Sequence, residues 1–560
     1  MDVLNFTTGP QSSPMAVAVL LAALICTLTY VASSTKAALS TRTTGTGAKR
    51  PPPVPYWVPG VGNLVSWMRD THGYVTRLAK QHNLQPFRVR LAHQTFYCIS
   101  APSDIATFFK AAWTETSLAT TTMVMRHVAG APASALDRVY AADDSGISAR
   151  PLPGSRVAPP QRFYHLHHRL VVAQMSGRRL GDTAARFAGA FERQLRGVAG
   201  GDAWTPVPDL HAWLGGVVFT ASVEALCGTR IFAVNPALAR DFRAFYAAVP
   251  TLLRGLPRFL APGAHAARER MLENLRRWNR AAREAPLEAA GPGWDEWWGC
   301  EFVKERKRLY GRMAGGVDED GMAADDLILL FVTNVNIVPA VSWMVINVLR
   351  TPGLLKRVLP AVDAAFGSGE IDLGEACNDA LLQSVYAETL RMHTTNMLSR
   401  YIHTDEQPLP GWRLPKKAMV FLLGNVAAFD EKVWNTGTEK DPHPVDEFWP
   451  DRFLVYPNDK RSAPSQTADP SEPRRGDGPA FSLAGLAGAW VPYGGGESMC
   501  PGRNFAKQEM IGSFALLTRM LEIELTGGDD VKYEGDKAFF FFGTMPPKGP
   551  IPARVRRRQL

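Results

Sequence analysis

The stretch "VPYGGGESMCPGRNFAKQEM", residues 491–510, places one cysteine, Cys500, between a run of glycines and the start of a predicted helix. Glycines let the backbone turn tightly and let a flat, bulky ligand come close. The proline and glycine after the cysteine open an apolar-periodic helix predicted over residues 501–520. The positive end of a helix dipole lowers the pKa of a thiol, so Cys500 is predicted to be a metal ligand or a nucleophile. The alternative is a buried structural cysteine beside a glycine turn.

Two charged patterns precede this loop in the chain. Glu388 and Arg391, in "LLQSVYAETLRMH" (residues 381–393), are three residues apart and therefore share one face of a predicted helix. The stretch "FWPDRF" then carries Arg452. A Glu-x-x-Arg pair alone is uninformative, because solvated helices contain many such pairs. Its position before the second arginine and the cysteine loop makes it informative.

Together these patterns resemble those of the cytochrome P450 monooxygenases. The loop matches in Tyr493, seven residues before Cys500, in Gly496, four before it, and in Gly502, two after it. The resemblance implies a mainly α fold with a small β subdomain, and a haem b whose iron is bound by the Cys500 thiolate. It implies a haem-thiolate monooxygenase that uses O₂ to oxidise unactivated carbon. It also implies a structural cluster on the haem side of the fold, made of Glu388, Arg391 and Arg452.

The resemblance also assigns residues to the haem propionates. Arg400 follows the Glu-x-x-Arg arginine by nine residues, where the family places a propionate arginine. Tyr164, His168 and Arg169 occupy the region of the family's Trp-x-x-x-Arg helix, although the tryptophan is absent. We expect either His168 or Arg169 to meet a propionate. Ser498 stands where many relatives have an arginine or histidine, so the anchoring must depend on other basic residues.

The long apolar helix predicted over residues 323–350 departs from the family pattern. Most members carry an acidic residue followed by threonine there, and this pair relays protons. Here the pair is Val335 and Asn336, followed by Pro339, which predicts a local opening of the helix. Asn336 can donate an amide hydrogen bond or order a water, but it cannot transfer a proton as an acid would. The alternative is an Asn336 side chain satisfied within the kink.

An asparagine with a proline three residues later resembles a subgroup that contains the sterol and oxysterol 7α-hydroxylases and prostacyclin synthase. The hydroxylases use O₂ and electrons that NADPH-cytochrome P450 reductase supplies through its flavins, in some cases together with cytochrome b5. The synthase isomerises an endoperoxide and needs neither O₂ nor reductase electrons. We favour the monooxygenase, because oxidases outnumber isomerases in the family and a membrane anchor suits a reductase-coupled system. A third reading is a non-enzymatic membrane haem protein, which would have no need of the cysteine loop and the charged cluster.

The resemblance places a substrate pocket on the face of the haem opposite the thiolate. Its expected side chains are mostly apolar, with hydroxyl and amide groups, which predicts a bulky lipophilic substrate such as a steroid, terpenoid or polyketide. The composition resembles that of filamentous-fungal chains, so we expect a role in secondary metabolism or sterol metabolism. The predicted substrate contacts are Ile337, Asn396, Leu398, Thr544 and Met545.

The N-terminal region carries the membrane signal. Residues 15–32 contain no charge, and 18 helical residues span roughly 27 Å, close to the hydrocarbon thickness of a bilayer. Basic residues follow this segment, so the positive-inside rule predicts a short lumenal segment 1–14 and a cytosolic body. A cleaved signal peptide would carry its basic residues on the other side. We therefore predict a single-pass endoplasmic reticulum protein with an anchor at 15–32, a polar and proline-rich linker at 33–64 and a catalytic domain at 65–560.

The composition excludes several other classes. The 560 residues are 46% apolar, enough for a substantial core. The six cysteines are scattered without Cys-x-x-Cys pairs, which argues against a zinc site or a disulfide framework. The net charge of +9 is dispersed and no nucleic-acid motif accompanies it, so nucleic acid is not an expected partner.

Overall fold

The computed structural model places most of the chain. The predicted lumenal segment, except for Pro14, and most of the polar stretch 458–478 lie outside the residues that it describes. The described residues are 14–40, 49–110, 114–115, 118–198, 201–285, 291, 293–313, 316–367, 369–402, 409, 411–457, 459, 462–466, 478–528, 531–540 and 543–559.

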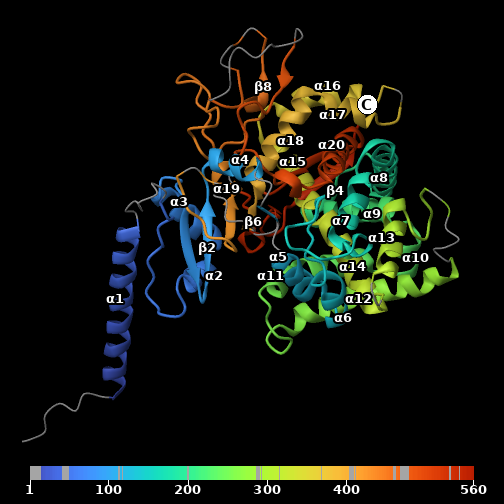
Figure 1. Ribbon diagram of the computed structural model, residues 1–560. Coiled ribbons are helices and arrows are strands. Elements are labelled where there is room, and N and C mark those ends of the chain that lie inside the picture. The colour runs from blue at the N-terminus through green and yellow to red at the C-terminus, as the bar shows by residue number, and fades with distance from the viewer. Residues whose placement is uncertain are drawn as a thin grey trace, which may run out of the picture. The chain divides into compact units, whose positions relative to one another are not determined.

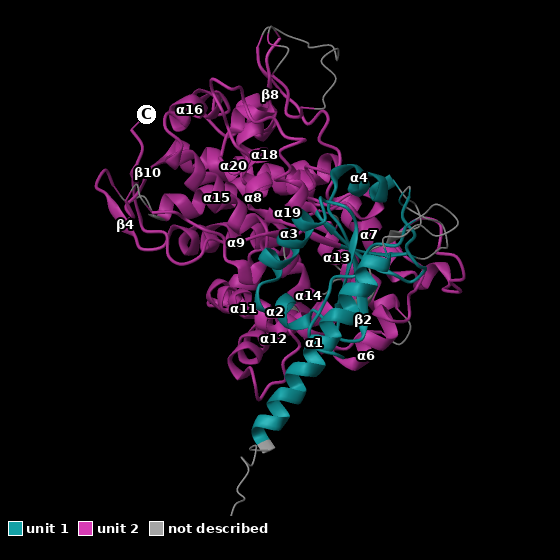
Figure 2. Cartoon of the chain, turned by 90° about the vertical axis from the view of Figure 1, so that its left-hand side faces the viewer, with its two compact units in different colours: residues 1–114, 399–423 teal, residues 115–398, 424–560 magenta. Residues whose placement is uncertain are grey.

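The chain divides into two units (Figure 2), and the described residues form many helices with four small sheets. The first unit contains residues 1–114 and 399–423, and the second contains residues 115–398 and 424–560. The predicted fold class, mainly α with a small β part, is confirmed. The candidate site lies within the second unit.

The first unit begins with α1 (Pro14–Ser40), which extends eight residues beyond the predicted anchor. Three helical stretches are long and apolar enough to cross a membrane: Met15–Ser40, Leu210–Cys227 and Glu319–Arg350. Most of the second and third stretches is buried inside the protein, whereas none of the apolar window of the first is buried. The second and third stretches are therefore apolar because they belong to the protein core. This leaves α1 as the candidate membrane span.

Two contacts hold α1 against the proline-rich segment within this unit. The Ser33 hydroxyl donates to the Tyr56 carbonyl at 3.2 Å and accepts from the Tyr56 N–H at 3.1 Å. The rings of Tyr30 and Trp57 stack with centroids 4.2 Å apart. These contacts set the direction in which the chain leaves the helix.

The strands of the largest sheet lie mainly in the first unit, in the order β1-β2-β7-β6-β3. Residues 86–100, "PFRVRLAHQTFYCIS", alternate and are rich in β-forming residues, which predicts a hairpin. This prediction is confirmed, because β1 and β2 pair antiparallel with Phe87 opposite Cys98. The strands of this sheet are β1 (Phe87–Leu91), β2 (Gln94–Ile99), β7 (Met419–Leu423), β6 (Met397–Ile402) and β3 (Thr114–Glu115), and the helices of this unit after α1 are α2 (Leu64–Arg69), α3 (Thr71–Gln81) and α4 (Pro102–Lys110).

The second unit is built around α20 (Arg503–Met520), which begins three residues after Cys500. In Figure 1, α20 lies beside α15 (Ile337–Arg350) and α18 (Ala380–His393). The other main helices are α7 (Phe163–Gln174), α8 (Gly177–Val198), α9 (Leu210–Cys227), α11 (Leu238–Leu253), α12 (Pro262–Ala281), α13 (Glu301–Arg312), α14 (Glu319–Asn334), α16 (Leu354–Ala364) and α17 (Leu373–Asn378).

Shorter elements complete the second unit. The small sheets pair β10-β12-β4, β11-β5 and β8-β9. Their strands are β4 (Thr205–Val207), β5 (Thr394–Thr395), β8 (Leu454–Val455), β9 (Ala480–Phe481), β10 (Leu521–Leu525), β11 (Gly543–Thr544) and β12 (Ala553–Arg557), and the short helices are α5 (Leu118–Val124), α6 (Ala133–Ala135), α10 (Arg230–Val234), α19 (Gly424–Ala427) and single turns at Met125–Ala129, Leu136–Tyr140, Pro159–Gln161, Ala282–Glu284, Pro450–Phe453, Gly496–Ser498 and Lys537–Phe539.

The long helix predicted over residues 323–350 is interrupted. It divides into α14 and α15, with Val335 and Asn336 between them. Pro339 has no N–H, so it cannot donate to the Val335 carbonyl four residues earlier. The opening expected from this proline is therefore present, and Asn336 lies within it.

Glu388 lies in a fully buried charged cluster. Its carboxylate accepts two hydrogen bonds from Arg391, at 2.7 and 2.9 Å, and one from Arg452 Nε at 3.3 Å. The Trp449 N–H donates a fourth, at 3.0 Å. The side chains of all three charged residues are completely shielded from solvent.

We expect Glu388→Gln to lower the free energy of unfolding by about 3–5 kcal/mol, because two guanidinium groups would lose their buried counter-charge. Urea denaturation of the haem-loaded protein measures this change. Glu375→Gln, on the exposed part of α17, is the control and should stay within about 0.5 kcal/mol of the parent. Equal stability of the two variants would contradict a stabilising role for the cluster.

Candidate haem-thiolate site

A cavity of about 560 Å³ lies within the second unit, a size typical of small-molecule and cofactor sites. Cys500 lies at its surface, and Asn336, in the interruption of the central helix, also lines it. Most of the remaining lining is apolar, including Val171, Ile328, Leu329, Val332, Ala340, Leu390, Phe505 and Met510.

The loop before α20 presents the Cys500 thiol to this cavity. The Cys500 N–H donates to the Tyr493 carbonyl at 2.9 Å, which closes the loop on itself. The Tyr493 hydroxyl accepts from that of Tyr386 on α18 at 2.7 Å. Cys500 is exposed, whereas Cys98, Cys227, Cys300 and Cys377 are buried and Cys26 is intermediate. An exposed thiol in an apolar cavity is unusual for a structural cysteine.

Two glycines of the cysteine loop belong to the cavity wall. Gly494 has φ +72°, and a Cβ there would lie 3.7 Å from the Leu398 side chain. A Cβ at Gly502 would lie 3.8 Å from Cys500 Sγ. Gly496 also has a positive φ, +69°, but it is exposed and does not line the cavity, so its role is in the turn.

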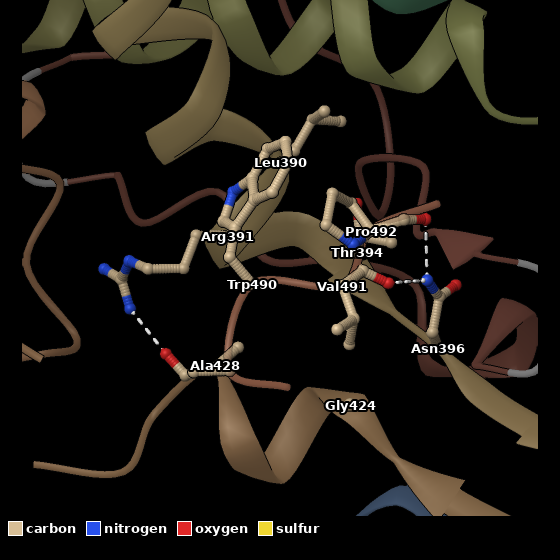
Figure 3. A pocket seen from close by; sticks show the side chains of 10 residues that line it. Leu390, Arg391, Thr394, Asn396, Gly424, Ala428, Trp490, Val491 and Pro492 are labelled. Carbon is tan, nitrogen blue, oxygen red and sulfur yellow. Dashed lines mark hydrogen bonds between the residues drawn. The ribbon is translucent and has the colours of Figure 1, made fainter. Parts of the chain in front are cut away.

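Asn396 holds the start of the cysteine loop. Its amide nitrogen donates to the Val491 carbonyl at 2.9 Å and to the Pro492 carbonyl at 2.7 Å (Figure 3). These bonds border a gap of only about 10 Å³, which is too small for any ligand larger than a water. Asn396 also lines the large cavity, but its two amide hydrogens are already used.

The helix terminus does not lower the net pKa of the Cys500 thiol. Burial raises this pKa, while the backbone N–H groups of Gly502 and Arg503 and the Arg503 charge act in the opposite direction. The predicted lowering is therefore outweighed by desolvation. Coordination to a metal removes the thiol proton outright, so the raised pKa does not exclude metal ligation.

Asn336 faces the cavity, and its side-chain oxygen is already engaged. Asn336 Oδ1 accepts the Thr544 N–H at 2.8 Å. A Cβ at Gly543 would lie 2.3 Å from this oxygen, and Gly543 has φ +106°. Only glycine can therefore occupy position 543 without strain, and the amide nitrogen of Asn336 is the group left for a ligand.

Four predicted substrate contacts line the cavity, while two other predicted residues do not. Ile337, Asn396, Leu398 and Thr544 belong to its wall. Val335 is 5% exposed and does not line the cavity, so the prediction that it takes part in the reaction is wrong. Met545 does not line it either, because its side chain packs against Gly535. In both cases the neighbouring residue, Asn336 or Thr544, has the inward-facing position.

The predicted propionate residues have different surroundings. Tyr164 and His168, on α7, line the cavity, whereas Arg169 is exposed to solvent. Burial lowers the pKa of His168. Ser498 does not line the cavity. Arg400 belongs to the first unit, where its guanidinium lies 5.6 Å from the Phe109 ring centroid and burial lowers its pKa to about 10.

Several lining residues were missed in the sequence. Arg306, on α13, is ion-paired with Asp325 and Asp326 on α14, and Arg306 and Asp325 reach the cavity wall together with His167. Glu509, on α20, also lines the cavity although it is only 2% exposed. For Glu509, the available signal was a charged residue within an apolar helical stretch. The sequence does not show toward which side of the helix such a side chain points. Thr333 lines the cavity too, with its hydroxyl bonded to the Leu329 carbonyl at 2.8 Å.

Comparison with known proteins identifies the family. The chain is 33% identical over 534 residues to the cytochrome P450 monooxygenase efuG of Hormonema carpetanum, covering 92% of this chain and 91% of that protein. This chain belongs to the cytochrome P450 family. The family's sequence profile, Cytochrome P450, matches residues 327–550. The P450 monooxygenase fsoE of Humicola fuscoatra is 32% identical over 553 residues, covering 94% of this chain and 91% of that protein.

More distant relatives agree with this assignment. The cholesterol 7-alpha-monooxygenase of Cricetulus griseus is 23% identical over 384 residues, covering 64% of this P450 and 68% of that protein. The predicted resemblance to the sterol 7α-hydroxylases is confirmed at that level. The crystal structure of the cytochrome P450DA heme domain has a TM-score of 0.62 at 15% identity and covers 91% of this chain and 98% of that chain, which confirms the P450 fold.

The residues of the site fit the haem that the P450 family implies. The cavity combines an exposed thiol, two glycines beside it and a broad apolar wall, which suits a flat macrocycle with a metal at its centre. Cys500 is the residue that would bind the iron, and Tyr164 and His168 lie where polar groups of the macrocycle's edge could be bound. The thiolate-bound haem supplies the chemistry that activates O₂.

We expect Cys500→Ala to abolish the thiolate-type spectrum of the carbon monoxide complex, because no thiol would remain at the cavity surface. Difference spectroscopy of the reduced, haem-loaded protein measures this. Cys377→Ala, at a buried cysteine, is the matched control and should keep the full spectrum. A thiolate-type spectrum in the Cys500 variant would contradict the ligand assignment.

Glu509 predicts a pH dependence of stability. Burial raises its pKa to about 8, well above the value of an exposed carboxyl. The folded state therefore holds a proton that the unfolded state releases near pH 4.5, so stability falls as the pH rises from about 4.5 to 8, by up to about 1.4 kcal/mol per pH unit.

The melting temperature of Glu509→Gln should fall less than that of the parent between pH 5 and 8, because glutamine does not titrate. Glu439→Gln, at an exposed position, should follow the parent. Parallel curves for the parent and Glu509→Gln would show that Glu509 is ionised throughout this range.

Proposed function

We propose that this cytochrome P450 is an NADPH-cytochrome P450 reductase-dependent monooxygenase that hydroxylates or otherwise oxidises a bulky lipophilic substrate. The observation that carries the proposal is the joint lining of one cavity by the Cys500 thiol and by an apolar wall that includes Ile337 and Leu398. An apolar wall binds a lipophilic molecule by excluding water from both surfaces. Steroids, terpenoids and polyketides are the proposed substrate classes.

A few polar groups on this wall would orient the substrate. Thr544 Oγ1 lies 3.2 Å from Thr394 Oγ1, and both residues line the cavity. The amide nitrogen of Asn336 can donate to a substrate oxygen or hold a water, since its oxygen is bound to the Thr544 N–H. The apolar part of the wall would add a constraint of shape to these polar contacts.

Proton delivery in this P450 would have to differ from the acid–threonine relay. Asn336 has no acidic proton, and the hydroxyl of Thr333 donates to a backbone carbonyl of its own helix. A water held by the Asn336 amide is the proposed proton carrier. Asn336 would then position the water, without itself changing its protonation state.

The cellular setting belongs to the same proposal. The α1 helix would anchor the P450 in the endoplasmic reticulum membrane, with residues 1–14 lumenal, 33–64 as a linker and 65–560 as a cytosolic catalytic domain. Fungal secondary metabolism is the proposed pathway class, supported by the similarity to P450 monooxygenases of Hormonema carpetanum, Humicola fuscoatra and Penicillium decumbens. Cytochrome b5 is a further proposed electron donor.

Turnover assays with and without the electron supply test the proposal. The haem-loaded full chain is incubated in lipid vesicles with a panel of steroids, terpenoids and polyketides, and products are identified by mass spectrometry. We expect a product heavier by one oxygen atom that requires NADPH, reductase and O₂ together and that carries ¹⁸O from ¹⁸O₂. Cys500→Ala is the inactive control.

An isomeric product formed without NADPH would contradict the proposal and would favour an isomerase of the prostacyclin synthase kind. Protein that binds haem but converts none of the panel, although the panel perturbs its haem spectrum, would favour a binding protein without catalytic activity.

A further inference from the structure

A second cavity lies on the other side of the helix interruption, within the same unit. Its volume is about 460 Å³. Asn334 and Val338 line this second cavity, whereas Thr333, Asn336 and Ile337 line the haem cavity. The short segment between α14 and α15 therefore separates two spaces. Cys500 does not line the second one, so this space is separate from the reaction site.

The walls of the second cavity are largely apolar. They come from α9, α11, α15 and the segment 536–547. Gly216 on α9 leaves the space open, because a Cβ at this position would meet no atom within 4 Å. The apolar lining residues are Ala212, Ala239, Phe242, Ala247, Val338, Phe539, Pro546 and Pro547.

The inner end of the cavity carries a buried acceptor without a partner. Asn334 is 1% exposed, and its Oδ1 atom has no hydrogen-bond partner among the described residues. Its amide nitrogen donates to the Leu330 carbonyl at 2.9 Å, which fixes the side chain in the orientation that leaves the oxygen free. A buried carbonyl oxygen without a donor is unfavourable by about 1–3 kcal/mol, so a ligand with a donor would be stabilised here.

His211 supplies a second acceptor. Its Nδ1 atom lies 2.8 Å from the Ser342 hydroxyl, which donates its own hydrogen to the Val338 carbonyl at 2.9 Å. Nδ1 must therefore carry the hydrogen of the neutral ring, and Nε2 must be the acceptor. Burial lowers the pKa of His211 to about 4, so the ring is neutral at pH 7.

Tyr246 adds a hydroxyl group. It is buried and has no hydrogen-bond partner among the described residues, and its ring stacks on Phe539 with centroids 4.8 Å apart. The charged residues that line the cavity are two arginines, Arg240 and Arg243, and two aspartates, Asp209 and Asp536. Because these charges balance, they favour neither an anion nor a cation.

We propose that this cavity is a second, non-catalytic binding site for an uncharged lipophilic molecule that carries hydroxyl groups. The apolar walls would hold its carbon skeleton, and its hydroxyl hydrogens would be donated to Asn334 Oδ1 and His211 Nε2. A charged ligand would lose its hydration without gaining a buried counter-charge at the inner end. Binding here requires no turnover, so the proposal is independent of the reaction proposed above.

Paired probes test this site in the haem-loaded full chain. Cyclododecanol and cyclododecanone share one carbon skeleton, but only the alcohol can donate a hydrogen bond. Equilibrium dialysis counts all the bound probe, and the haem absorption spectrum reports the probe in the haem cavity. For the parent protein we expect one equivalent of alcohol that leaves the haem spectrum unchanged, with an affinity about 5–10-fold higher than that of the ketone at the same site.

Two variants locate the binding. Gly216→Phe should remove the spectrally silent equivalent and leave the response of the haem spectrum as in the parent. Gly181→Phe is the matched control, at an exposed glycine of α8 whose Cβ would also meet nothing within 4 Å, and it should keep this equivalent. Asn334→Leu, of similar volume, should reduce the preference for the alcohol to about 1–2-fold.

Several outcomes would overturn the proposal. These are an absence of silent binding in the parent, an unchanged silent equivalent in Gly216→Phe, or equal affinities of the parent for the alcohol and the ketone. If Gly216→Phe fails to load haem, Asn334→Leu decides, since an undiminished preference for the alcohol in this variant would equally overturn the assignment.

Discussion

The buried carboxylate of Glu388 is the interaction on which the position of the thiol depends. A carboxylate without solvent is stable only when donors surround it, and here Arg391, Arg452 and the Trp449 N–H provide them. They fix α18 against the 3₁₀ turn at Pro450–Phe453. The same helix holds the cysteine loop, because the Ala387 carbonyl accepts from Trp490 Nε1 at 3.1 Å and Tyr386 bonds Tyr493. The charged cluster therefore acts on Cys500 at a distance, as a positioning element.

The interrupted central helix is the second constraint. Pro339 removes one helical donor at the break, and the residues around the break line two different cavities, Asn336 the first and Asn334 the second. Asn336 is held toward the haem cavity by the Thr544 N–H, and this contact requires glycine at position 543. Asn334, two residues earlier, is held toward the second cavity by its bond to the Leu330 carbonyl. One proline thus links the chemistry of the haem cavity to the shape of the space behind it.

The elements that the sequence predicted well are those with strong local signals. The hairpin formed by β1 and β2 follows from alternating β-branched and aromatic residues, and α18 and α20 coincide with the helices predicted around the Glu-x-x-Arg pair and after Cys500. The helix α8 was not predicted individually, although buried Leu180, Phe187 and Leu195 recur along it at helical spacing and the helix packs against α9. Val335 and Met545 were expected to face the ligand, but each is one residue from the side chain that does. The direction in which a side chain points at a helix break or a strand end depends on tertiary contacts. Sequence spacing therefore cannot tell which of two adjacent residues faces the cavity.

The sequence by itself determined the cysteine that faces the haem, the charged cluster behind it, the apolar N-terminal helix and the break in the central helix. Each depends on residue types at short, regular separations, where backbone geometry leaves few alternatives. Only the tertiary structure decided that Asn336 Oδ1 accepts a hydrogen bond from the Thr544 N–H and that Glu509 is buried at the cavity wall. It also decided that His168 rather than Arg169 lines the cavity. The second cavity was also visible only in the tertiary structure, because Asn334, His211 and Tyr246 come from three different helices. Such groups meet only when the helices pack, since no local rule relates side chains that are tens to hundreds of residues apart in the chain.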